Sequence, residues 1–202
     1  FCTIEPNIGV VPIPDERLSV LAEKHKSQKI VPSGVRFVDI AGLVKGASQG
    51  EGLGNQFLSH IREVDAIAHV VRAFTDDNII HVHGAPDPKN DAEVIGLELC
   101  MADLKTVERR LGEVEGKAKS GDKEALMFRE ILSKIKDALG RGQWAREVET
   151  ADEEKKLLRE LQLLTLKPML YVINDDENIS HRDSLPALEP RGPRPEKRRA
   201  GG

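Results

Sequence analysis

The sequence has few aromatic residues and few cysteines. Five Phe, one Trp and one Tyr are the only aromatic side chains in 202 residues, whereas charged residues make up 32%. Aliphatic side chains must therefore supply most of any core. The two cysteines, Cys2 and Cys100, are too few for a disulfide framework and favour a reducing compartment. We therefore expect a cytoplasmic protein.

Long apolar runs and a strong net charge are also missing. No run approaches the roughly 20 apolar residues of a membrane-spanning helix, so no membrane partner is expected. A formal net charge of −4 gives no general attraction to nucleic acid, and no specific DNA binding is expected. The chain does not begin with Met, and its first letters, FCTIEPN, are typical of the interior of a protein. We expect a fragment.

A glycine-rich segment lacks two well-known phosphate-binding motifs. This segment, DIAGLVKGASQGEGLGNQFL at residues 39–58, follows the apolar run VRFV, as a phosphate-binding loop follows a strand. Asn55 or Phe57 stands where a dinucleotide-binding loop has its third glycine, and no Lys-Ser or Lys-Thr pair follows the glycines. The segment is therefore neither a Rossmann turn nor a Walker A loop.

Short apolar runs alternate with stretches of helical periodicity. The strand candidates are IGVVPIPD, GVRFVDIAG, DAIAHVVRAF and KPMLYVIN, and the helix candidates are DERLSVLAEKHK and residues 53–64. This alternation predicts an α/β fold with a parallel, doubly wound sheet, in which ligands bind at the carboxyl ends of strands. Asp39 and Asn174 stand at two of these ends.

A long charged region lies between the last two strand candidates. Two series of apolar residues recur there at helical spacing, with KSGDKEA as a turn: Ile95, Leu99, Leu104, Val107, Leu111 and Val114, then Ile131, Ile135 and Leu139. The pattern predicts a coiled-coil-like antiparallel hairpin, and an ordinary solvated helical subdomain explains it equally well.

The chain therefore divides into four parts. Residues 1–90 form one part of an α/β domain, 91–166 the helical hairpin, and 167–177 a further strand of the same domain. The tail at 178–202 is basic and rich in proline, so we expect it to be disordered.

Three groups of residues can carry chemistry. A strand that ends in Asp-x-x-Gly, as Asp39 to Gly42 does, suits a nucleotide triphosphatase, because the Asp holds Mg²⁺ through water and the Gly N–H approaches the terminal phosphate. The polar group NDDE at 174–177 either reads the edge of a base or is a plain polar exit from a strand. His81 either orients water or shares one polar face with His83.

Three stretches resemble one known family. FCTIEPNIGVVPIPD, FVDIAGLVKGASQGEGLGNQFLSHIREVDAIAHVVRAF and DDNIIHVHG are similar to the YchF subfamily of Obg-type GTP-binding proteins, also called Obg-like ATPases. The similarity runs from Phe1 to about Glu177. It implies a P-loop NTPase domain, the Obg-type G domain, with an inserted helical hairpin and a following TGS domain. The P-loop and the TGS domain are not recognisable here, so an incomplete P-loop NTPase is expected.

The resemblance also implies roles for single residues. Thr3 and Asp39 would ligate Mg²⁺, and Gly42 would contact the terminal phosphate. Leu43 stands where Ras-like proteins have a water-orienting Gln, and in this subfamily a histidine, here His81, takes that role.

The base-reading group departs from the guanine-specific pattern. Glu177 is one methylene longer than the usual Asp and would be misplaced for guanine, whereas Asn174 can still bond an adenine edge. The resemblance therefore implies ATP as the preferred nucleotide, with GTP possible.

Two functional hypotheses follow. One is a molecular switch that hydrolyses ATP or GTP, although residues 1–202 alone are expected to be inactive without a P-loop. The other is a binding module whose helical hairpin docks on a ribosome or another protein without catalysis of its own.

Overall fold

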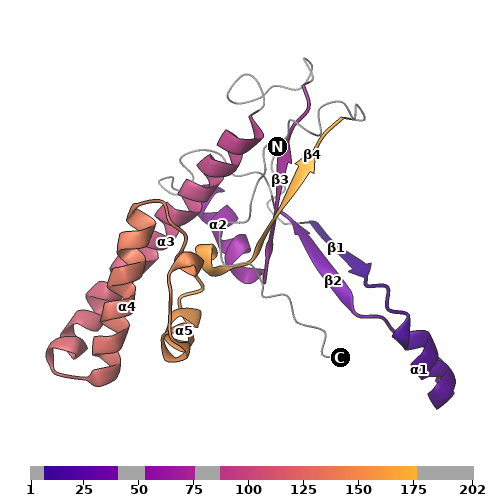
Figure 1. The fold of residues 1–202 in the computed structure, drawn as a ribbon, viewed down its shortest axis with the longest axis horizontal. Coiled ribbons are helices and arrows are strands. Elements are labelled where there is room, and N and C mark those ends of the chain that lie inside the picture. The colour runs from indigo at the N-terminus through magenta and orange to yellow at the C-terminus, as the bar shows by residue number, and fades with distance from the viewer. Residues whose placement is uncertain (1–6, 41–52, 76–86, 177–202) are drawn as a thin grey trace, which may run out of the picture. The chain divides into compact units, whose positions relative to one another are not determined.

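The computed structural model describes residues 7–40, 53–75 and 87–176 (Figure 1). These residues belong to two compact units that divide at Gly42 and Leu43. Each unit contains one pair of hydrogen-bonded strands. The strands and helices expected outside the charged region are all present.

The first unit is an antiparallel ribbon with one helix. It contains β1 (Asn7–Pro12), α1 (Arg17–His25) and β2 (Gly34–Asp39), and Asn7 lies opposite Asp39 in the ladder. The expectation of parallel strands is therefore wrong for this pair. A parallel pair needs a crossover segment that packs back on the sheet, whereas α1 buries none of its residues and the chain reverses direction beyond it.

The second unit begins with α2 (Leu53–Glu63) and β3 (Ile67–Arg72) and ends with β4 (Met169–Asn174). β3 and β4 pair in parallel, with Ile67 opposite Met169 and Arg72 opposite Asn174. One face of the pair is less exposed than the other, and α3 (Pro88–Lys119) contacts β3. The parallel arrangement expected for these two strands is confirmed.

The long charged region is mainly helical. It contains α3, α4 (Lys123–Gly140) and α5 (Asp152–Arg159), with short 3-10 helices at Ala145–Glu147 and Leu164–Leu166. α4 packs against the C-terminal part of α3 (Figure 1). Asp122 caps α4 by accepting a hydrogen bond of 2.9 Å from the Ala125 N–H.

The buried line of α3 differs in part from the expected one. Leu99, Val107 and Val114 are buried as expected, but Ile95, Leu104 and Leu111 are half-buried. The other buried residues of the helix are Ala92, Gly96, Glu98, Cys100, Ala102, Asp103 and Ala118. On α4, Ile131, Ile135 and Leu139 are all buried, as expected.

The tryptophan ring packs directly on α3. A Cβ on Gly96 would lie 3.4 Å from the Trp144 ring, an ordinary van der Waals distance, so the ring lies against the helix at this position. Trp144 is only 1% exposed and is the largest fully buried side chain among the described residues. The sole tryptophan therefore fixes the segment after α4 against α3.

A buried carboxylate ties α3 to the start of β4. Asp103 is 0% exposed and accepts three hydrogen bonds, from the Leu164 N–H at 2.9 Å, the Thr165 N–H at 2.7 Å and the Thr165 hydroxyl at 2.7 Å. The Thr165 hydroxyl in turn accepts from the Ala145 N–H at 3.3 Å. Burial raises the pKa of Asp103, and the bonds from Thr165 and Leu164 offset part of that rise.

Asp103→Asn should destabilise the fold by about 2–4 kcal/mol, because the new amide N–H group faces donors that now bond the two carboxyl oxygens. Urea unfolding measures the change. Asp137→Asn, on the exposed side of α4, is the matched control and should change stability by less than about 0.5 kcal/mol. Equal effects of the two substitutions would contradict the role of Asp103 in holding α3 to residues 164–165.

The same substitution predicts a pH dependence. Since the folded-state pKa of Asp103 is raised, the folded protein binds this proton more tightly than the unfolded chain does. The stability advantage of the unsubstituted chain over the Asp103→Asn variant is therefore largest below the unfolded pKa and shrinks as pH rises through the folded pKa. Urea unfolding of both proteins, from below the unfolded pKa of Asp103 to above its folded pKa, measures this advantage. An advantage that grows with pH would show that the three hydrogen bonds outweigh burial.

Candidate functional site

The carboxyl ends of β3 and β4 bring several polar groups together. Arg72 ends β3 directly opposite Asn174, which ends β4, and the Ala73 N–H donates to the Asn174 carbonyl at 2.8 Å. Because the two strands are parallel, the residues that follow both strands emerge at the same edge. This is the place where ligands bind in α/β folds of this type.

Arg72 is held in a defined position at this edge. Its Nε donates to the Phe74 carbonyl at 2.9 Å, and its guanidinium carbon lies 4.5 Å from the centre of the Phe74 ring. Both side chains are half-buried. The edge therefore offers a cationic group stacked on an aromatic ring.

Asp175 adds an acceptor without a partner. Its Oδ1 accepts from the Asp176 N–H at 2.9 Å, but its Oδ2 is buried and has no hydrogen-bond partner within the described residues. A buried acceptor of this kind calls for a donor from water or a ligand. The exposed amide of Asn174 stands beside it in sequence.

The residues that lead into β4, at the end of the strand opposite Asn174, are also held in place by hydrogen bonds. Lys167 Nζ donates to the Arg62 carbonyl at 2.9 Å and to the Val64 carbonyl at 2.5 Å, both at the end of α2. Burial lowers the pKa of Lys167, while nearby Asp65 raises it. The Arg62 guanidinium reaches α3 through a 3.3 Å bond to the Thr106 hydroxyl. β4 is therefore tied to both α2 and α3 before it reaches Asn174.

Two of the six expected site residues are described. Asp39 ends β2 in the first unit and is exposed, and Asn174 ends β4 in the second unit. Thr3, Gly42, His81 and Glu177 lie outside the described residues. Both described residues do stand at strand ends, as their sequence positions indicate.

Two residues of the edge, Arg72 and Phe74, were missed in the sequence, and Asp175 was given no role of its own within the NDDE group. Arg72 and Phe74 lie at the end of the strand candidate DAIAHVVRAF, and the rule that ligands bind at strand ends applies to them as it does to Asn174. Only the pairing of β3 with β4, however, shows that Arg72 and Asn174 are neighbours.

The described residues contain neither a cluster of metal ligands nor a membrane-spanning helix. No three His, Cys, Asp or Glu side chains within residues 7–40, 53–75 and 87–176 are arranged to hold a metal ion. The exposed carboxylate of Asp39 fits Mg²⁺ chemically, since Mg²⁺ prefers oxygen donors and keeps several waters. None of the helices described is both long and apolar enough to cross a membrane.

Comparison with known proteins shows which family the chain resembles. The family described as "50S ribosome-binding GTPase" matches residues 1–100. The protein named "Ribosome-binding ATPase YchF" of Bacillus subtilis is 57% identical over 178 residues, which cover 88% of this chain and 49% of the relative. Its namesake in Mycoplasma genitalium is 51% identical over 191 residues, 94% of this chain and 52% of the relative.

A solved structure agrees with these relatives. The structure of the Schizosaccharomyces pombe YchF GTPase is similar with a TM-score of 0.68 and 40% identity, and the match covers 87% of this chain and 48% of that one. The chain thus spans about half the length of the relatives that it matches. These similarities identify the fold as that of a P-loop NTPase. The chain belongs to the YchF family.

Proposed function

We propose that this chain is the nucleotide-binding part of a molecular switch that hydrolyses ATP, and GTP less readily. The observation that carries the proposal is the edge where Arg72, Asn174 and Asp175 meet at the ends of two parallel strands. The relatives named as ribosome-binding ATPases support the same reaction.

We assign the contacts with Mg²⁺ and the terminal phosphate to three residues. Asp39 and Thr3 would hold Mg²⁺, and the Gly42 N–H would bond the terminal phosphate. When bound, Mg²⁺ neutralises the charge that develops on the phosphate oxygens. Asp39 supports this role because it is an exposed carboxylate at the end of a strand.

The base side is assigned to the end of β4. The Asn174 amide would bond an adenine edge, and Glu177 would exclude the bidentate contact that guanine needs. The Asp175 Oδ2, buried and without a partner among the described residues, is an acceptor that suits an N–H donor of the ligand. ATP preference follows from these groups.

Water activation is assigned to His81. Leu43 cannot hydrogen-bond water, so another group must orient the attacking water near the terminal phosphate. A histidine does this near neutral pH, because its unperturbed pKa lies close to 6.5.

His81→Ala should lower ATP turnover at least about a hundredfold, the usual loss for a missing general base or water-orienting group. The measurement is phosphate release by a longer version of the chain, in which the B. subtilis relative supplies the parts outside residues 1–202. Binding of ATP should stay within about threefold, because the base and phosphate contacts remain.

His83→Ala is the matched control, since His83 lies two residues away in the same run. It should keep turnover within about threefold. Equal losses from the two substitutions would assign both histidines to a shared polar face and remove His81 from the reaction.

The helical hairpin at 91–166 is proposed as the arm that contacts the ribosome, which would place the protein in the cytoplasm. The named activity of the relatives supports the partner, and the hairpin offers exposed charged side chains at its tip, among them Lys117, Lys119 and Lys123. A switch of this kind needs a partner that reads its nucleotide state.

The charge-reversed variant K117E/K119E/K123E should reduce co-sedimentation of the longer version with ribosomes at least about fivefold, because each lost ion pair weakens binding. Its ATP turnover without ribosomes should stay unchanged. A binding module without catalysis would instead show no turnover in any variant, and unchanged co-sedimentation would exclude the hairpin tip.

A further inference from the structure

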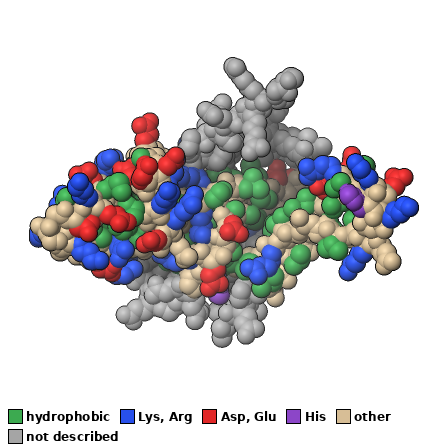
Figure 2. Space-filling view, turned by 90° about the horizontal axis from the view of Figure 1, so that it is seen from below, with side chains coloured by type: hydrophobic (Ala, Val, Ile, Leu, Met, Phe, Trp, Pro, Cys, Tyr) green, Lys and Arg blue, Asp and Glu red, His purple; other side chains and the backbone are tan. Residues whose placement is uncertain are grey.

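Exposed apolar side chains are concentrated in one part of the chain. Of the fourteen large apolar residues that are exposed among those described, ten lie within residues 7–40. Figure 2 shows hydrophobic side chains, in green, at the surface along the β1–β2 ribbon. The α3–α4 pair exposes a single one, Leu97.

The fold explains only some of these residues. Ile8, Val10, Val35 and Phe37 lie on strands, and strands of a P-loop sheet are normally covered on both faces. The exposed Val20 and Leu21 of α1, 65% and 51% exposed, do not lie on a strand. Ile30 and Val31, 49% and 68% exposed, follow the helix and also lie outside the strands.

A shallow hollow lies next to these residues. It has a volume of about 260 Å³, and Pro12, Ile13, Leu18, Ile30 and Pro32 form most of its lining. The lining is therefore mainly apolar and rigid, because three prolines restrict the backbone around it. It has the character of a pocket for one or two apolar side chains.

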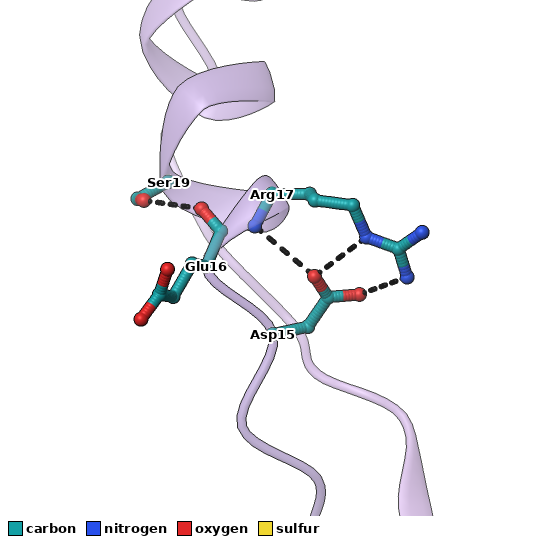
Figure 3. Close-up of polar contacts among 4 residues, drawn as sticks. All are labelled: Asp15, Glu16, Arg17 and Ser19. Atoms are coloured by element: carbon teal, nitrogen blue, oxygen red, sulfur yellow. Dashed lines mark hydrogen bonds and ion pairs between the residues drawn. The ribbon is translucent and has the colours of Figure 1, made fainter. Parts of the chain in front are cut away.

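The one acidic residue of the hollow is neutralised. The Asp15 Oδ1 accepts from Arg17 Nε at 2.8 Å, and its Oδ2 accepts from Arg17 Nη2 at 2.7 Å (Figure 3). The hydrogen bond from the Arg17 side chain lowers the pKa of Asp15 to about 2, so the two side chains stay charged and paired at neutral pH. The hollow therefore presents no net negative charge from this pair.

Three lysines belong to the same stretch of sequence as these apolar residues. Lys24, Lys26 and Lys29 are exposed and form no ion pair within the described residues. The helix dipole favours Lys24 in the last turn of α1, but it does not explain Lys26 and Lys29, which follow the helix. The acidic residues nearby are Glu16 and Glu23.

We propose that α1 and residues 26–32 form a docking surface for an acidic, amphipathic helix of a partner protein. An apolar hollow with a basic margin matches a helix that carries apolar residues on one face and carboxylates beside them. Charge complementarity selects an acidic partner. RNA would use the lysines but not the apolar hollow. The residues of this surface differ from those assigned to the nucleotide.

The test uses the 202-residue chain and a labelled synthetic peptide of about five helical turns, with leucine on one face and glutamate on the other. Fluorescence anisotropy should show saturable binding that weakens as salt is added. Hydrogen exchange should show protection at residues 17–31. A peptide of the same composition in scrambled order should bind at least about tenfold more weakly, because it lacks an apolar face.

Two variants separate this surface from general charge attraction. K24E/K26E/K29E should weaken peptide binding about tenfold or more, and Val31→Ser should weaken it about twofold to fivefold. The matched control K117E/K119E/K123E reverses three lysines elsewhere and should leave binding within about twofold. Circular dichroism checks that all variants keep their helices.

Several outcomes would overturn the proposal. Absence of saturable binding would exclude this partner chemistry. Equal losses in the two triple variants would reduce the effect to net charge. Equal binding of the ordered and scrambled peptides would remove the apolar hollow from the interaction, and tighter binding of a single-stranded RNA with no change in Val31→Ser would assign the lysines to phosphate contacts.

Discussion

The carboxylate of Asp103 joins the middle of α3 to the residues that lead into β4. A buried charge is tolerated only if donors surround it, and here two backbone N–H groups and one hydroxyl do so. All three donors come from Leu164 and Thr165, just before the strand. This polar contact therefore sets the position of β4. The same helix, α3, also packs against α4.

This contact has consequences at the other end of the strand. With Lys167 bonded to the end of α2 and Asp103 bonded to residues 164–165, the first residue of β4 is fixed from two sides. The ladder with β3 then carries this position along the strand to Asn174, opposite Arg72. The Asp103 and Lys167 contacts are thus mechanically connected to the candidate nucleotide site, although they lie at the opposite end of β4.

Much of this could be predicted from the sequence. Local periodicity located all four strands and the helices around them, because alternation and helical spacing depend on neighbouring residues. The direction of the β1–β2 pair was predicted wrongly, because it depends on whether α1 packs on the sheet, which no local pattern records. Asp103 was missed because a polar residue within an apolar series is expected to face solvent. Only its distant partners Leu164 and Thr165 show that it is buried.

The site shows the same limit. Asn174 was predicted because a polar residue at the end of an apolar strand can be recognised from the sequence alone. Arg72 was not predicted, and Asp175 received no role of its own within the NDDE group, because their importance depends on which strands are neighbours and on an acceptor left without a partner among the described residues. The family resemblance supplied the roles of Thr3, Gly42, His81 and Glu177, which the described residues do not include.

The most direct test of nucleotide binding at the strand ends is a titration of labelled ATP and GTP in Mg²⁺ with the longer version of the chain and with its Asn174→Ala variant. The expected result is tighter binding of ATP than of GTP, with ATP affinity about twofold to tenfold lower in the variant, the loss for one hydrogen bond. Equal ATP affinity in both proteins would contradict the placement of the base beside Asn174.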